Sequence, residues 1–206
     1  MHKHLRSQKP HSKRYASVQE RRGTLCNRVS IDERPDIVAQ KTRIGDWEGD
    51  TVIGKNHKGG LATLAERKSR YVLAGHIQSK HAAGVTAVTT RLLNPHKDKC
   101  HTITFDNAKE FAEHESMATE LKADIYFAHP YSSWERGLNE NSNGLIRQYF
   151  PKGMDLSDIF EEHVQWAVER PNHRPRKVLG YRTPHEVFFW VEINYTKQTP
   201  AVALRN

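Results

Sequence analysis

Three carboxylates in three separate segments are the side chains of this sequence best suited to chemistry. They are Asp50 in WEGDTVIG, Asp106 in TITFDN and Glu140 in SWERGLNENSNG, with 33 residues between the last two. Hard divalent cations prefer oxygen ligands, which several chain segments can supply together. Two such ions can activate an attacking oxygen and stabilise a leaving one. The pattern therefore predicts a two-metal phosphoryl-transfer site.

The first of these acids is chosen from three candidates. Asp46, Glu48 and Asp50 share one side of an extended segment. We select Asp50 because residues 51–53 are strand formers, and we expect Asp46 and Glu48 to lie nearer a loop that leads into the strand. A carboxylate among buried strand residues is costly unless a cation or a hydrogen-bond donor compensates it.

Asp106 follows the apolar run 102–105, which predicts that it stands at the carboxyl end of a strand. Ligands of open α/β sheets bind at such ends. The alternative is that Asp106 is only a turn or helix cap.

Glu140 belongs to a predicted helix over residues 133–149. Helical spacing places Trp134, Leu138, Leu145 and Tyr149 on one stripe that we expect to dock on the sheet. Glu140 is then about 200° from Leu138, on an open face with Arg136, Asn143 and Arg147. Taken alone, a solvent-facing Glu would be the simpler interpretation.

The remaining patterns predict how these acids are positioned. Strand patterns cover residues 50–53, 61–66, 71–77, 102–105 and 125–128, and helix patterns cover 81–93, 109–121 and 133–149. The order βββαβαβα requires a mixed sheet with parallel members and helices on its faces. We therefore predict one α/β domain with five strands.

Charge is concentrated at the start of the chain, whose net charge is +8. Residues 1–30 hold eight of the 32 Lys and Arg side chains and one of the 24 acids. We expect a flexible basic arm or linker remnant that neutralises phosphates, with an inert tail as the alternative. The predicted divisions are this arm at 1–30, a core domain at 31–195 and a tail at 196–206.

A second basic cluster is interrupted by Pro171, Pro175 and Pro184, so we expect an ordered loop rather than a continuous helix. Phosphate contact is its natural use, and a solvated connector is the alternative. Its cations are Arg170, Arg174, Arg176, Lys177 and Arg182.

The cysteines and the hydropathy pattern suggest the compartment. Cys26 and Cys100 are too few for a disulfide scaffold or a Cys-type zinc site, so both are expected to be free thiols. The 13 histidines form no metal-binding motif. No apolar signal core follows Met1 and no run approaches membrane-spanning length. We expect a cytoplasmic, nucleoid-associated protein.

Several long strings carry a family resemblance from about residue 30 to residue 188. GDWEGDTVIG, TFDNAKEF, HPYSSWERGLNENSNGLIRQYFPKG and RPRKVLGYRTPHEVF resemble the catalytic domain of insertion-sequence transposases of the IS30 family. The resemblance implies a ribonuclease-H-like core of the retroviral integrase type with an Asp-Asp-Glu triad. Carried over by position, that triad is Asp50, Asp106 and Glu140, and Trp47 also fits the integrase pattern.

Three departures qualify the resemblance. Ala108 stands where relatives usually have Gly, and a left-handed turn there would be strained. Pro171 is expected to end its helix early. Relatives also carry an N-terminal helix-turn-helix region that reads the element ends, and we expect this chain to be a truncated copy or a fragment.

The resemblance implies DNA cleavage and strand transfer by two Mg²⁺ ions, with Mn²⁺ able to substitute. The partners would be DNA, as element ends and target duplex, and further copies of the chain in a dimer or larger oligomer on DNA. We expect Trp134 to pack in the core rather than stack on bases, with Tyr131 beside it near a mobile loop. The alternatives are a metal-dependent nuclease of the same fold and an inactive DNA-binding fragment that inhibits full-length transposase. The predicted DNA contacts are Arg136, Asn139, Asn143, Arg147, Lys152, Arg174, Arg176 and Lys177.

Overall fold

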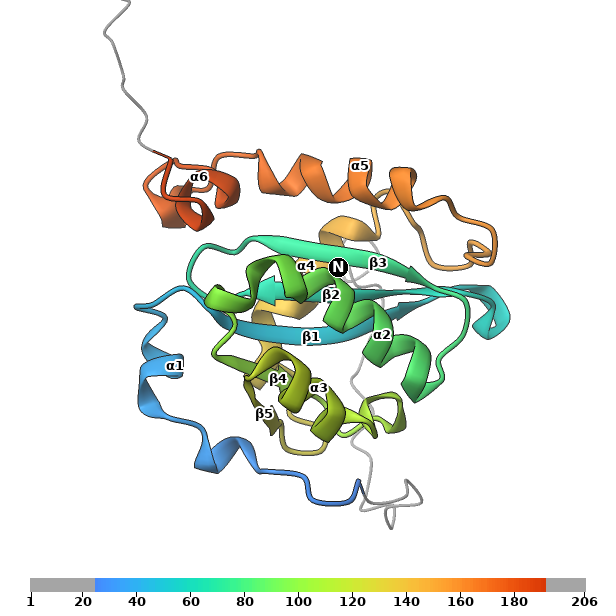
Figure 1. The fold of residues 1–206 in the computed structure, drawn as a ribbon. Helices are drawn as coiled ribbons and strands as arrows, with labels where there is room; N and C mark the ends of the chain where they lie inside the picture. The colour runs from blue at the N-terminus through green and yellow to red at the C-terminus, as the bar shows by residue number, and fades with distance from the viewer. Residues whose placement is uncertain (1–24, 192–206) are drawn as a thin grey trace, which may run out of the picture.

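The computed structural model describes residues 25–191, in which five strands form one sheet with the order β3-β2-β1-β4-β5 (Figure 1). β1, β2 and β3 are antiparallel neighbours, whereas β4 and β5 run parallel to β1. The predicted mixed sheet is confirmed, and its first strand begins four residues earlier than expected. The strands are β1 (Asp46–Ile53), β2 (Gly60–Glu66), β3 (Val72–Ile77), β4 (Thr102–Phe105) and β5 (Asp124–Phe127).

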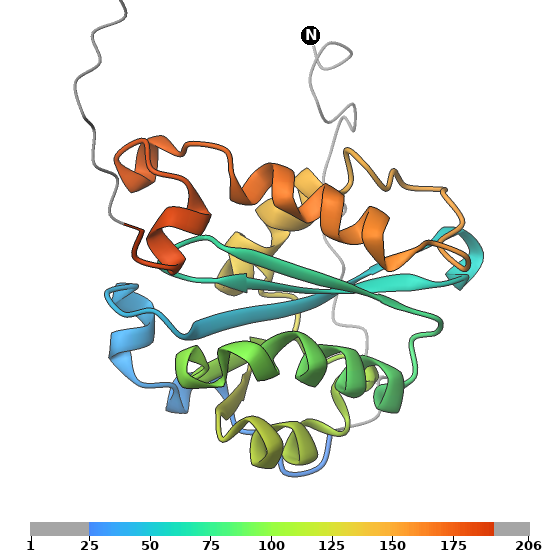
Figure 2. The same ribbon diagram turned by 45° about the horizontal axis from the view of Figure 1, so that its top comes forward.

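Helices cover both faces of this sheet. Figure 2 shows α4 and α5 on one face and α2 and α3 on the other. The α-helices are α1 (Asp36–Gln40), α2 (Ala82–Leu93), α3 (His114–Leu121), α4 (Gly137–Ile146), α5 (Glu161–Asn172) and α6 (Pro184–Phe188). Short 3₁₀ turns are η2 (Ile31–Glu33), η3 (Lys55–His57), η4 (Asn94–Lys99), η5 (Lys109–Phe111), η6 (Ser133–Arg136) and η7 (Lys177–Leu179). Between residues 25 and 191, none of the helices has the length and apolar character needed to cross a bilayer.

Two apolar cores lie on the two sides of the sheet, and the alternation of β1 divides its residues between them. Trp47 belongs to the core beneath α2 and α3, whereas Val52 belongs to the core beneath α4 and α5. Gly49 faces the first core so closely that an added Cβ would lie 2.1 Å from the Phe105 ring. Asp50 therefore faces the α4 side.

The predicted helix over residues 133–149 is divided and presents a different face to the sheet. It starts as η6, continues as α4 and ends with Arg147 as its C-cap. The predicted packing stripe is wrong, because the buried residues of α4 are Asn139, Ser142 and Ile146, and Trp134 is 74% exposed. The reason is that β1 offers polar Glu48 to this helix, so an amide rather than an aromatic ring packs against it.

Two expected departures from the family pattern do not disturb the backbone. Ala108 has φ −82° and ψ 144°, so no left-handed turn occurs there. Pro171 lies inside α5, which continues to Asn172, so the prediction of an early end is wrong. The last turn is anchored by the Asn172 side chain, which accepts from the N–H of Val72 at 2.9 Å and donates to its carbonyl at 2.8 Å.

The end of the predicted basic arm packs on β5. Leu25 is buried in the core beneath α2 and α3, and the carbonyl of Val29 accepts from the N–H of Phe127 at 2.9 Å. Ser30 forms a parallel bridge with Phe127 as well. The rest of the predicted arm, residues 1–24, and the predicted tail, 196–206, lie outside the described residues.

Candidate active site

Asp50 and Asp106 lie close together on the α4 side of the sheet. β1 and β4 are parallel neighbours, so Asp50 within β1 and Asp106 just after β4 stand on adjacent strands. The Arg136 guanidinium lies between them, with Nη1 3.6 Å from an Asp50 oxygen and Nη2 3.4 Å from an Asp106 oxygen. Its Nη1 also donates to the carbonyl of Gly49 at 3.1 Å. The two carboxylates are thus near enough to share one cation.

Asp50 is a largely buried carboxylate, and within residues 25–191 its one nearby cation is the Arg136 guanidinium. Burial raises the pKa of its carboxyl above the ordinary value, although the Arg136 guanidinium and the Thr51 N–H lower it. The neighbouring carboxylates of Asp106 and Glu110 raise this pKa further. A site that disfavours an ionised Asp in this way gains from an additional cation.

Amide side chains of α4 fix the helix against this part of β1. Asn143 donates to an Asp50 oxygen at 3.0 Å and accepts from the Thr63 hydroxyl at 2.8 Å. Asn139 is fully buried, and its backbone N–H and side-chain amide donate to the side chain and carbonyl of Glu48 at 2.9 and 3.1 Å. These contacts fix the rotation of α4 about its axis and therefore the direction of its remaining side chains.

Glu140 is exposed on α4 and forms no hydrogen bond or ion pair with either aspartate. It stands four residues after Arg136 and three before Asn143, both of which contact Asp50, so all three share one side of the helix turn. No cluster of three or more His, Cys, Asp or Glu side chains within residues 25–191 is arranged to hold a metal ion. The structure therefore brings Asp50 and Asp106 together and leaves Glu140 apart from them.

Asp46 and Glu48, the other two acids of β1, are both buried and paired. Asp46 accepts from Arg43 and from the Thr102 hydroxyl, each at 2.9 Å, and Glu48 pairs with Arg67. Both are nearer than Asp50 to the loop that enters β1, as expected, but the strand begins at Asp46 and already carries them inside the sheet. Their charges are already compensated, which leaves Asp50 as the accessible acid.

Glu110 is an acid near the site that the sequence patterns did not single out. It is 5% exposed, accepts from the Thr51 hydroxyl at 2.8 Å and pairs with Lys80 at 2.8 Å. The available signal was its place four residues after Asp106 in TFDNAKEF. It lies in a 3₁₀ turn, which interrupts the helical periodicity that would have marked it as buried.

The residues predicted to contact DNA differ in accessibility. Asn139 is buried, and Arg147 donates to the carbonyl of Ile53 at 2.9 Å. Arg176 is half-buried and donates to the carbonyl of Pro171 at 3.2 Å. The exposed members of the set are Lys152, Arg174 and Lys177.

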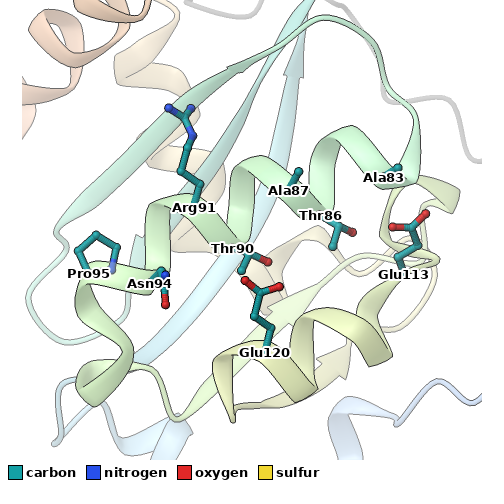
Figure 3. Close-up of a pocket in the computed structure, with 9 residues that line it drawn as sticks. All are labelled: Ala83, Thr86, Ala87, Thr90, Arg91, Asn94, Pro95, Glu113 and Glu120. Carbon is teal, nitrogen blue, oxygen red and sulfur yellow. The ribbon is translucent and has the colours of Figure 1, made fainter.

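A separate pocket of about 590 Å³ lies between α2 and α3, on the face opposite α4 (Figure 3). Thr86 and Thr90 line it, and their hydroxyls are buried without a hydrogen-bond partner. Glu113 and Glu120 of α3 and its flank stand across from them. The pocket contains none of the three acids predicted to be catalytic.

The fold and the paired aspartates define a chain with the catalytic-core fold of retroviral integrases. The catalytic core domain of BIV integrase matches with a TM-score of 0.55 and 21% identity over 70% of this chain and 93% of that one. The HTLV-2 integrase catalytic core domain in complex with magnesium matches with a TM-score of 0.56 and 18% identity over 71% and 97%. A chain of the simian T-cell lymphotropic virus intasome in complex with PP2A regulatory subunit B56 gamma matches with a TM-score of 0.58 and 18% identity. The match covers 80% of this chain and 59% of that one.

The chain is also similar in sequence to transposases of insertion sequences. It is 48% identical over 188 residues to the transposase of insertion sequence IS4351 from Bacteroides fragilis, covering 91% of this chain and 58% of that protein. It is 35% identical over 190 residues to transposase InsI of IS30A from Escherichia coli K12, covering 89% of this chain and 49% of that protein. The matched part of the chain is thus similar to transposases of the IS30 family. The chain spans about half the length of these relatives, and no family model matches it.

Proposed function

We propose that this chain is the catalytic domain of a DNA transposase, performing divalent-metal-dependent strand cleavage and strand transfer. The single observation that carries the proposal is the pair Asp50 and Asp106 on adjacent strands, close enough to share the Arg136 guanidinium. The relatives with transposase names and the integrase-core fold agree with it.

The donor set fits Mg²⁺, with Mn²⁺ as a substitute. Carboxylate oxygens are the ligands that these ions prefer, and a cation beside Asp50 would offset the burial that raises the pKa of its carboxyl. The guanidinium between the two aspartates stands in for that positive charge. Asp50, Asp106 and Glu140 would hold the metal, with the exposed Glu140 side chain reorienting toward the two aspartates. When bound, two such ions activate the attacking oxygen and stabilise the departing one.

The protein's own residues prepare this site. Asn143 orients Asp50 through its amide, and Asn139 fixes α4 on β1 so that Glu140 keeps its place between Arg136 and Asn143. Exposed Lys152, Arg174 and Lys177, together with Arg176, would neutralise DNA phosphates. The simian intasome neighbour supports assembly of several copies on DNA. We place this activity in the bacterial cytoplasm at the nucleoid.

The test is a strand-transfer reaction with Mg²⁺ and pre-cleaved duplexes carrying the ends of the element that encodes the chain. The variants are D50N, D106N and E140Q, and E120Q on the opposite face is the matched control. We expect joined products from the wild type and from E120Q and none from the other three. Cleavage without joining would instead support the nuclease, and DNA binding without any metal-dependent product would support the inactive fragment.

A further inference from the structure

A second pocket, of about 200 Å³, opens at the start of α4. Residues of five separate segments meet there: the end of α1, strand β1, the turn after β2, the η6 turn and the first turns of α4. The side chains on which the argument depends are Lys41, Arg67, Arg70 and Trp134.

The pocket carries uncompensated positive charge. Of its two acids, Glu48 is paired with Arg67, and Glu135 is bonded to His129 at 2.9 Å. Lys41 and Arg70 form no ion pair within residues 25–191. Two cations are therefore available to an anionic ligand.

Trp134 supplies an aromatic surface beside these cations. Its side chain is 74% exposed, although a ring of this size normally contributes to a core. Nucleic-acid bases stack on such exposed rings whatever their sequence, and cations alongside them contact the backbone. A cation pair next to an open indole matches a nucleotide better than it matches an isolated anion.

The pocket adjoins the candidate active site. Glu48, which lines it, precedes Asp50 by two residues on the same face of β1, a separation of about 7 Å. Trp134 precedes Arg136 by two residues, and Arg136 contacts both aspartates. A strand whose phosphate lies at Asp50 would place a neighbouring nucleotide within reach of Trp134.

We propose that this pocket takes one unpaired nucleotide of the DNA strand being processed, with the base on Trp134 and the phosphate between Lys41 and Arg70. This inference rests on the proposed transposase function and adds a specific subsite to it. It also assigns a use to Trp134, the exposed indole of η6.

The test compares two DNA substrates in Ca²⁺, which we use to allow binding without turnover. One is a blunt element-end duplex, and the other has a recessed strand that leaves one nucleotide unpaired, replaced by 2-aminopurine. Binding affinity and 2-aminopurine quenching are measured for W134L and K41Q. The matched controls are W166L, a half-exposed indole on α5, and K122Q, a lysine in the same left-handed helix-capping conformation as Lys41.

We expect W134L to weaken binding of the unpaired-end DNA by about tenfold, the usual effect of losing one base stack, and to abolish the quenching. Blunt DNA should bind W134L as it binds the wild type, and W166L and K122Q should leave both substrates unaffected. Equal losses for both substrates, or no loss in W134L, would overturn the pocket while leaving the transposase proposal intact. A wild-type chain that binds neither substrate would overturn both.

Discussion

Arg136 offers a direct way to perturb the candidate site, because its guanidinium lies where a metal ion would have to bind. The variant R136Q keeps a polar side chain but removes the positive charge that faces Asp50 and Asp106. Two opposite effects are expected. The protein should become less stable without metal and should respond more strongly to Mg²⁺.

The magnitude follows from the burial of the three side chains. Their exposed fractions are 11% for Arg136, 27% for Asp50 and 35% for Asp106. Fully exposed pairs contribute about 0–1 kcal/mol, whereas breaking a buried pair costs about 3–5 kcal/mol. An intermediate site should lose about 2 kcal/mol. If Mg²⁺ must displace the guanidinium, the same energy weakens wild-type Mg²⁺ binding by about 30-fold.

The assay is urea unfolding with and without saturating MgCl₂. Ligand binding to the folded state adds to its stability by mass action, so R136Q should gain up to about 2 kcal/mol more from Mg²⁺ than the wild type gains. R43Q is the matched control. It breaks the ion pair of Arg43 with Asp46, which lies on β1 away from the site. Equal Mg²⁺ increments in the wild type and R136Q would refute the reasoning.

Three further predictions concern stability, thiol reactivity and pH. G49A should destabilise the protein by about 2 kcal/mol because its Cβ would overlap a buried ring. G144A on α4, where nothing lies within 4 Å of an added Cβ, should stabilise the protein by about 0.5–1 kcal/mol. Thermal unfolding measures both changes. Exposed Cys26 should react with Ellman's reagent in the native protein. Burial raises the pKa of the Cys100 thiol to about 12, so Cys100 should react only after unfolding. Two thiols that react rapidly in the native protein would contradict this prediction. Hydrogen bonds to Glu135 and Asp32 raise the pKa of the His129 imidazole in the folded protein. The imidazolium should therefore stabilise the fold below pH about 6.5, the ordinary pKa of His, and this contribution should be lost as the pH rises through the pKa of the folded state. NMR titration of its imidazole in the wild type and in D32N would measure that pKa, and identical values would contradict the assignment.

The sequence was sufficient for the succession of strands and helices and for a mixed five-stranded sheet, but not for the side-chain partners. Strand patterns and the carboxyl-end position of Asp106 depend on local hydrophobicity, which the chain displays openly. The orientation of α4 was predicted wrongly, because its periodicity was read from apolar residues while the helix docks through Asn139 and Asn143 on a polar strand. Which of the β1 acids stays accessible depends on distant partners such as Arg67, and no local pattern reveals these.

The position of Glu140 was also beyond local patterns. Its helical offset from Arg136 and Asn143 is readable in the sequence, but the docking of α4 decides whether that side of the helix meets Asp50. Trp134 shows the same limitation, since an indole at helical spacing resembles a core residue until the η6 turn exposes it.

The most direct test of the central claim is a crystal structure of this chain soaked with Mn²⁺, examined by anomalous scattering. Mn²⁺ should bind between Asp50 and Asp106, with metal–oxygen distances of about 2.2 Å. Glu140 should join the ligands and the Arg136 guanidinium should withdraw from the two aspartates. Anomalous peaks elsewhere, or Asp50 and Asp106 still held by Arg136 at saturating Mn²⁺, would contradict the assignment of these carboxylates as the metal site.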